Sequence, residues 1–158
     1  MSIKKFLLLS IKLFFLVFAF LVIYITFAGL LITGLPDGPA DPGMVPAPFD
    51  LVIVAAAHAL VLAWIITRSN WRGWKLVLAV AFSYYGTITF MSQIETWYFL
   101  SDLTVSPETL RGLFLMGIPT ALLYSLLAVL VLSKWKGPEK TLPESEFPPI
   151  PLTQWVWK

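Results

Sequence analysis

The chain has 158 residues, of which 58% are hydrophobic and only 13% are charged, and a soluble domain of this length could not bury so much apolar surface in one core. Disorder is excluded because 15% of the residues are aromatic, and the absence of cysteine excludes disulfides, iron–sulfur clusters and zinc–thiolate sites. The formal net charge of +2 is too small to indicate nucleic-acid binding. These properties predict a polytopic membrane protein.

Four segments are long and apolar enough to cross a bilayer. A spanning helix needs about 20 mostly apolar residues, because it must cross about 30 Å of hydrocarbon at 1.5 Å per residue. The segments that meet this requirement are residues 13–35, 51–67, 76–100 and 112–133. The first is longer than the apolar core of a signal peptide, so we expect it to be retained. The prediction is an all-α fold, in which residues 1–133 form a bundle of four transmembrane helices.

The connections between these spans differ in composition. Residues 36–48 are rich in proline and glycine, which predicts a turn segment, and residues 68–75 form a short basic connection. Within the polar connection 101–109, Ser106 is expected to cap a helix that begins at Pro107.

The basic residues predict the orientation. Three lysine or arginine residues precede the first span, three lie between the second and third spans, and four follow the fourth, whereas only Arg111 lies on the other side. The positive-inside rule therefore predicts a multi-pass protein of the cell membrane with both termini in the cytoplasm. Residues 134–158 would then be a proline-rich cytoplasmic tail. Its segment 147–152 is expected to adopt a polyproline II conformation, which suits docking to a partner.

His58 is the only histidine and lies near the middle of the second span. An ionisable side chain at this depth indicates a candidate functional site. It has four interpretations: an interhelical hydrogen bond to a hydroxyl of the third span, a proton relay or gate in a small transporter, an axial ligand to haem or a chlorophyll-type pigment, or a polar contact with another subunit. The sequence leaves these open.

The third span carries an unusually polar face. Helical spacing aligns Tyr85, Thr89, Ser92 and Thr96, with Gln93 on one flank and Glu95 on the other. Lipid cannot pair with these groups, so the face is expected to point into the bundle, a cavity or a partner. One interpretation is a hydrogen-bonded seam with an ion pair between Glu95 and Arg111, and the other is a site for a proton, cation or small polar molecule. Because Glu95 lies nearer the outer boundary than His58, we expect the two to be separate features.

Small residues recur at every fourth position in two spans and predict close helix packing, within one subunit or between subunits. They are Ala55, Ala59 and Ala63 in the second span, and Gly117, Ala121 and Ser125 in the fourth.

The chain contains no motif of a hydrolase, metalloprotease, nucleotide-binding loop or dinucleotide-binding fold. We therefore expect a non-enzymatic accessory or scaffold subunit of a membrane complex, with the lipid bilayer and other membrane subunits, or further copies of itself, as partners. No metal site, cofactor or nucleic-acid partner is predicted. The alternatives are a small oligomeric transporter or channel lined by Glu95 and Gln93, and a subunit that binds haem or a pigment through His58.

Overall fold

A computed structural model describes residues 3–32, 47–98, 106–132 and 134–135 of the chain. These residues are all-helical, and the elements are α1 (Ile3–Leu31), α2 (Ala47–Arg68), α3 (Gly73–Tyr84), the π-helical segment η1 (Tyr85–Phe90), α4 (Met91–Tyr98) and α5 (Pro107–Val131). The segments α3, η1 and α4 follow one another without a break and make one span. The described chain thus holds four helices that are long and apolar enough to cross a membrane, which confirms the predicted fold class.

The helix boundaries differ from those predicted by hydropathy. Helix α1 begins at Ile3 rather than residue 13, because no glycine or proline interrupts the lead-in to Lys12. Helix α2 begins at Ala47 and accepts Pro48 in its first turn, where a missing N–H leaves no hydrogen bond unmade. The third span begins at Gly73 and includes the end of the predicted basic connection. The predicted ends at residues 35, 100 and 133 lie outside the described residues.

The start of α5 is set by local capping. The Ser106 hydroxyl accepts a hydrogen bond from the backbone N–H of Thr109 at 3.1 Å, and Pro107 is the first helical residue. This confirms the helix start predicted from these two residues. The span therefore begins before residue 112 and includes Arg111.

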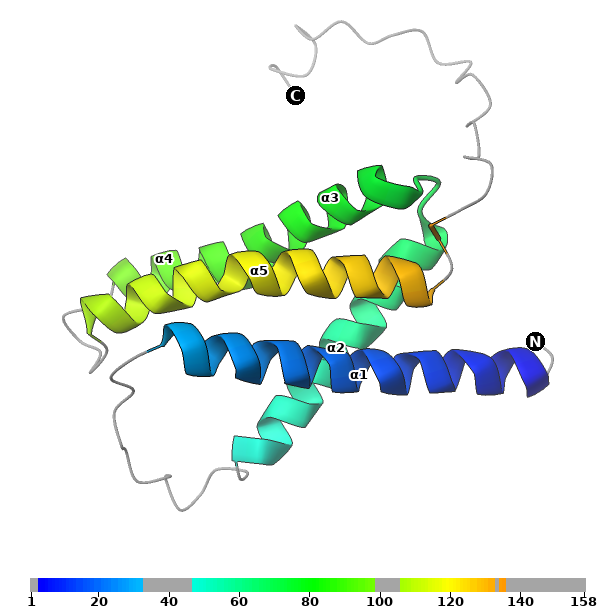
Figure 1. Ribbon diagram of the computed structural model, residues 1–158, viewed down its shortest axis with the longest axis horizontal. Helices are drawn as coiled ribbons and strands as arrows, with labels where there is room; N and C mark the ends of the chain where they lie inside the picture. Colours follow the sequence, from blue (N-terminus) through cyan, green and yellow to red (C-terminus); the bar gives the residue numbers. More distant parts are fainter. Residues whose placement is uncertain (1–2, 33–46, 99–105, 133, 136–158) are drawn as a thin grey trace, which may run out of the picture.

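The helices do not pack as four parallel rods. Helices α1 and α5 lie side by side, the third span lies against α5, and α2 crosses behind them at a steep angle (Figure 1). The approach of α1 to α5 is close at Gly112, where a Cβ atom would overlap the carbonyl oxygen of Leu31. Large apolar side chains such as Phe14 and Phe82 remain exposed, as expected for a surface that lipid surrounds.

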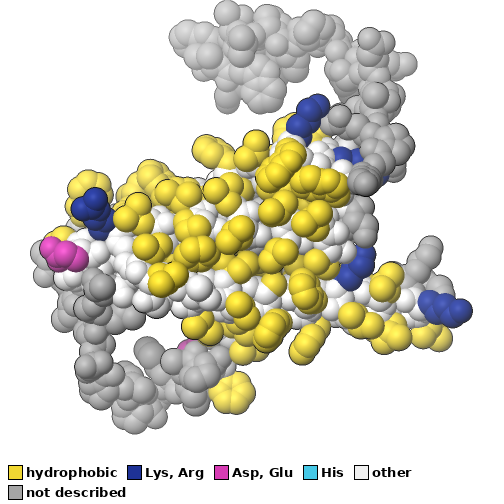
Figure 2. Space-filling view, in the orientation of Figure 1, with side chains coloured by type: hydrophobic (Ala, Val, Ile, Leu, Met, Phe, Trp, Pro, Cys, Tyr) yellow, Lys and Arg dark blue, Asp and Glu magenta, His cyan; other side chains and the backbone are white. Residues whose placement is uncertain are grey.

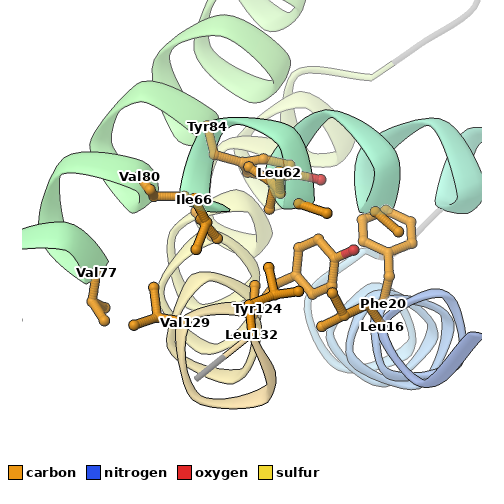
Figure 3. Packing of buried hydrophobic residues seen from close by; sticks show 14 of the residues in the cluster. Leu16, Phe20, Leu62, Ile66, Val77, Val80, Tyr84, Tyr124, Val129 and Leu132 are labelled. Carbon is orange, nitrogen blue, oxygen red and sulfur yellow. The ribbon is translucent and has the colours of Figure 1, made fainter. Parts of the chain in front are cut away.

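The buried core joins all four spans. Figure 3 shows side chains of α1, α2, α3 and α5 converging, among them Phe20, Ile66, Tyr84 and Tyr124. Both predicted stripes of small residues belong to this interior, since Ala55, Ala59 and Ala63 are buried, as are Gly117, Ala121 and Ser125. The stripes therefore serve helix packing within one chain.

Basic side chains gather at one end of the bundle. Figure 2 shows lysine and arginine side chains mainly at the end where α1 begins, whereas acidic side chains lie at the opposite end. Lys134, three residues after the end of α5, lies at this basic end, because its carbonyl oxygen accepts a hydrogen bond from the N–H of Gly73 at 3.1 Å. The ring centroids of Trp74 and Trp135 lie 5.3 Å apart. This segregation fits the predicted topology, and the cytoplasmic location of the basic end stays a prediction. Residues 136–158 of the predicted tail lie outside the described residues.

Candidate functional site

A cavity of about 430 Å³ lies between the four spans. Each span contributes to its lining, for example through Tyr24 of α1, His58 of α2, Gln93 of α4 and Thr120 of α5. Its volume falls within the range typical of small-molecule sites. We refer to it as the central cavity.

The central cavity extends from the middle of the bundle toward the start of α2. Both His58 and Asp50 line it, and their separation along α2 corresponds to about 12 Å at 1.5 Å per residue. Asp50 is exposed and lies in the first turn of α2. The cavity thus reaches from membrane depth to a carboxylate at the end of the bundle opposite the basic residues.

His58 is held by aromatic rings. Its ring centroid lies 5.0 Å from that of Phe20 and 5.3 Å from that of Tyr84, and the Tyr84 contact is edge to face. The Nδ1 atom is buried and has no hydrogen-bond partner among the described residues. The interhelical hydrogen bond considered for His58 is therefore not made at Nδ1 within the described residues, and the third span contacts His58 through the ring of Tyr84.

A second polar group of the lining is also unpaired. Oε1 of Gln93 is buried and has no hydrogen-bond partner within the described chain. The Tyr124 hydroxyl is also buried without a hydrogen-bond partner in the described chain. The ring of Tyr124 packs on Phe20 and Tyr84, which both line the cavity. A buried polar atom without a partner costs about 1–3 kcal/mol, and lipid offers it no replacement. Such atoms around one cavity are typical of a site that receives water or a polar ligand.

The six polar residues predicted to form a seam do not share one face. Thr89, Ser92 and Gln93 line the central cavity. Tyr85 lies on another side of the span, where its hydroxyl donates to the carbonyl oxygen of Phe114 at 3.5 Å. The Thr96 hydroxyl donates to a backbone carbonyl of its own helix, that of Ser92, at 3.0 Å.

The π-helical segment η1 explains this division. In a π-helix each N–H bonds five residues back, as the N–H of Met91 does to the carbonyl oxygen of Gly86. The extra residue in the turn rotates everything that follows it, so the face of Tyr85 continues at Phe90, whose ring centroid lies 6.3 Å away, and not at Thr89. The prediction assumed uninterrupted α-helical spacing and so placed Tyr85 and Thr89 on one face.

Glu95 lies outside the central cavity. It borders another hollow on the flank of the third span, together with Thr87, Met91 and Tyr98, and of the residues around this hollow Ser92 also lines the central cavity. Two residues correspond to about 200° of rotation in an α-helix, so Glu95 faces away from the direction taken by Gln93. Glu95 and Arg111 are both exposed, and no ion pair joins them in the part of the chain that the structure describes. The structure thus keeps Glu95 and His58 apart, as expected from their depths in the span.

Three tyrosines in or beside the central cavity were not among the predicted site residues. Tyr24, Tyr84 and Tyr124 occur inside three different spans, whereas tyrosine in membrane proteins favours the interfaces. Their depth within the spans was a signal that they lie in the interior of the bundle.

No three His, Cys, Asp or Glu side chains among the described residues are grouped so that they could hold a metal ion. No known protein family, curated protein or solved structure matches the chain.

Proposed function

We propose that this small polytopic membrane protein binds a small polar solute in the central cavity and transports it across the membrane. One observation carries the proposal: His58 and Gln93, on different spans, line the same cavity, and each has a buried polar atom, Nδ1 and Oε1 respectively, with no hydrogen-bond partner among the described residues. A solute that pairs with both atoms would remove two desolvation costs at once, which provides a binding free energy that lipid cannot.

The lining indicates the chemistry of the solute. The amide oxygen of Gln93 requires a hydrogen-bond donor. The rings of Phe20, Tyr24 and Tyr84 offer apolar and π surfaces to the remainder of the molecule. Asp50 at the mouth favours the approach of neutral or cationic molecules over anions. The proposed solute is therefore a small neutral or cationic molecule with at least one N–H or O–H group.

Transport is favoured over an accessory or scaffold role by the packing of the small residues. Those stripes were one sequence argument for association with other subunits, and they are buried inside this chain. A second argument rests on the tail, whose residues 136–158 lie outside the described residues, and the third, the absence of catalytic motifs, fits a transporter equally well. A cavity bordered by all four spans, beside a π-helical turn, is in contrast a common arrangement for a ligand site.

The proposal is tested on the full chain purified in detergent and in proteoliposomes. Thermal unfolding is measured against a panel of small neutral and cationic solutes, since a ligand at 100 times its Kd stabilises the folded state by about 2.7 kcal/mol. Solutes that stabilise the protein are then measured for flux. We expect His58→Phe and Gln93→Met to weaken both effects and the matched control Glu95→Gln to retain them in full.

Two outcomes would overturn the proposal. In one, no solute in the panel raises the melting temperature. In the other, the solute flux of both cavity variants equals that of the wild-type protein. An absorption spectrum of the same preparation tests the cofactor alternative, because a haem or pigment on His58 would give visible bands that the His58→Phe variant lacks.

A further inference from the structure

A second cavity, of about 470 Å³, lies between α2 and α3 and is lined mainly by aliphatic side chains. We refer to it as the lateral groove. Val61 and Ile65 of α2 line it and remain 55% and 41% exposed, so the groove opens on the flank of the bundle at membrane depth. On the third span its lining runs from Leu76 to Ile88, which is about 18 Å along the helix. That length is close to one leaflet, half of about 30 Å of hydrocarbon.

The groove ends at the basic end of the bundle. Ser69 and Trp71, in the connection between α2 and α3, form this end. The Lys134 ammonium donates to the carbonyl oxygen of Ser69 at 3.1 Å, which fixes a positive charge beside the mouth of the groove. Helix α3 starts there as well, with Arg72 at its N-cap position and no side-chain capping hydrogen bond among the described residues. The N-terminal dipole of α3 adds to the positive potential.

We propose that the lateral groove binds an anionic phospholipid, with one acyl chain along the groove and the phosphate beside Lys134. The apolar wall is one leaflet long and ends in positive charge at the depth of the headgroups, which matches the two parts of such a lipid. Trp71, which is 52% exposed, lies at this boundary, where tryptophan favours the interface. The groove shares His58, Tyr84 and Ile88 with the central cavity. The lipid proposal does not rest on the function proposed for that cavity, because lipid binding needs no solute.

The experiment measures the lipid retained by the purified full chain. The protein is exchanged into detergent, incubated with dioleoyl phosphatidylglycerol or dioleoyl phosphatidylcholine, and analysed by native mass spectrometry. Wild-type protein is expected to retain phosphatidylglycerol in preference to phosphatidylcholine. Lys134→Gln should reduce that preference about fivefold, the effect of one surface lysine on an anionic lipid, whereas Lys4→Gln at the exposed start of α1 should not.

A second pair of variants tests the groove itself. Val61→Trp fills the groove from an exposed position that leaves the core intact, and it should remove retained lipid of either kind. Val52→Trp, at an exposed position of the same helix outside the groove, is the matched control. Equal retention of the two lipids by wild-type protein, or equal retention by the Val61→Trp and Val52→Trp variants, would overturn the proposal. A protein or peptide bound in place of lipid, and lost in Val61→Trp, would overturn it as well.

Discussion

Gln93→Met separates a structural from a functional role for the buried amide. Methionine has nearly the same length as glutamine and adapts to irregular space, so the variant removes the polar atoms while keeping the volume. Because Oε1 of Gln93 has no partner in the described chain, its replacement should recover the cost of an unpaired buried group, about 1–3 kcal/mol. For a chain of this size the melting temperature should rise by roughly 2–4 °C per kcal/mol.

The same substitution should weaken solute binding, since the donor of the solute is then left unpaired in the cavity. A cost of about 1–3 kcal/mol corresponds to a roughly 5- to 150-fold loss of affinity. Stability would thus rise while binding falls, a combination that a purely structural residue does not produce.

Thermal unfolding in detergent, with and without the stabilising solute, measures both quantities in one experiment. Ile94→Met is the matched control, because Ile94 is the next residue on α4, is 41% exposed and does not line the central cavity. Its melting temperature and solute affinity should equal those of the wild-type protein. If Gln93→Met melts below wild type and binds the solute equally well, the amide has a structural partner and the reasoning is refuted.

Three further predictions concern the packing of α1 on α5, the cap of α5 and the role of Glu95. Gly112→Ala should destabilise the protein by about 1–3 kcal/mol because its Cβ would meet the carbonyl oxygen of Leu31, whereas Gly29→Ala, with nothing within 4 Å, should be neutral or stabilising by up to about 1 kcal/mol; thermal unfolding of the pair distinguishes them. Ser106→Ala removes the cap of α5 and should cost about 0.5–2 kcal/mol, with Ser106→Asp restoring it in the same melting assay. Glu95→Gln should leave solute flux in proteoliposomes unchanged, and a loss of flux would bring this residue into the transport path.

The four spans were predictable because crossing hydrocarbon demands a long apolar run, and the chain contains four of them. Their ends were less so, since a helix continues past the hydrocarbon until a residue stops or caps it. Ser106 was identified because its capping signal is local, whereas nothing in the apolar run from residue 13 showed that α1 begins at Ile3. Hydropathy identifies the segments that cross the membrane, whereas local capping and helix-breaking residues determine where each helix ends.

The site was only partly predictable for a different reason. His58 and Gln93 stood out singly, because polar side chains at membrane depth are costly. Their arrival in one cavity depends on the steep crossing of α2 and on the π-turn in the third span, and neither follows from residue spacing (Figure 1). The same turn separates Tyr85 from the polar residues that were expected to accompany it.

The π-turn also explains how Gln93 reaches the central cavity although the same span packs tightly against α5. The side chain of Thr89 occupies the space that a Cβ at Gly117 would need, so η1 and α5 are in close contact there. Within η1 the Thr87 hydroxyl donates to the carbonyl oxygen of Ser83, which supplies a donor to a backbone group at the start of the turn. The close contact fixes the rotation of the span, and the extra residue then directs Gln93 inward and Glu95 outward. A regular α-helix through this segment would rotate α4 by about 100° relative to α3, and Gln93 would no longer share the cavity with His58.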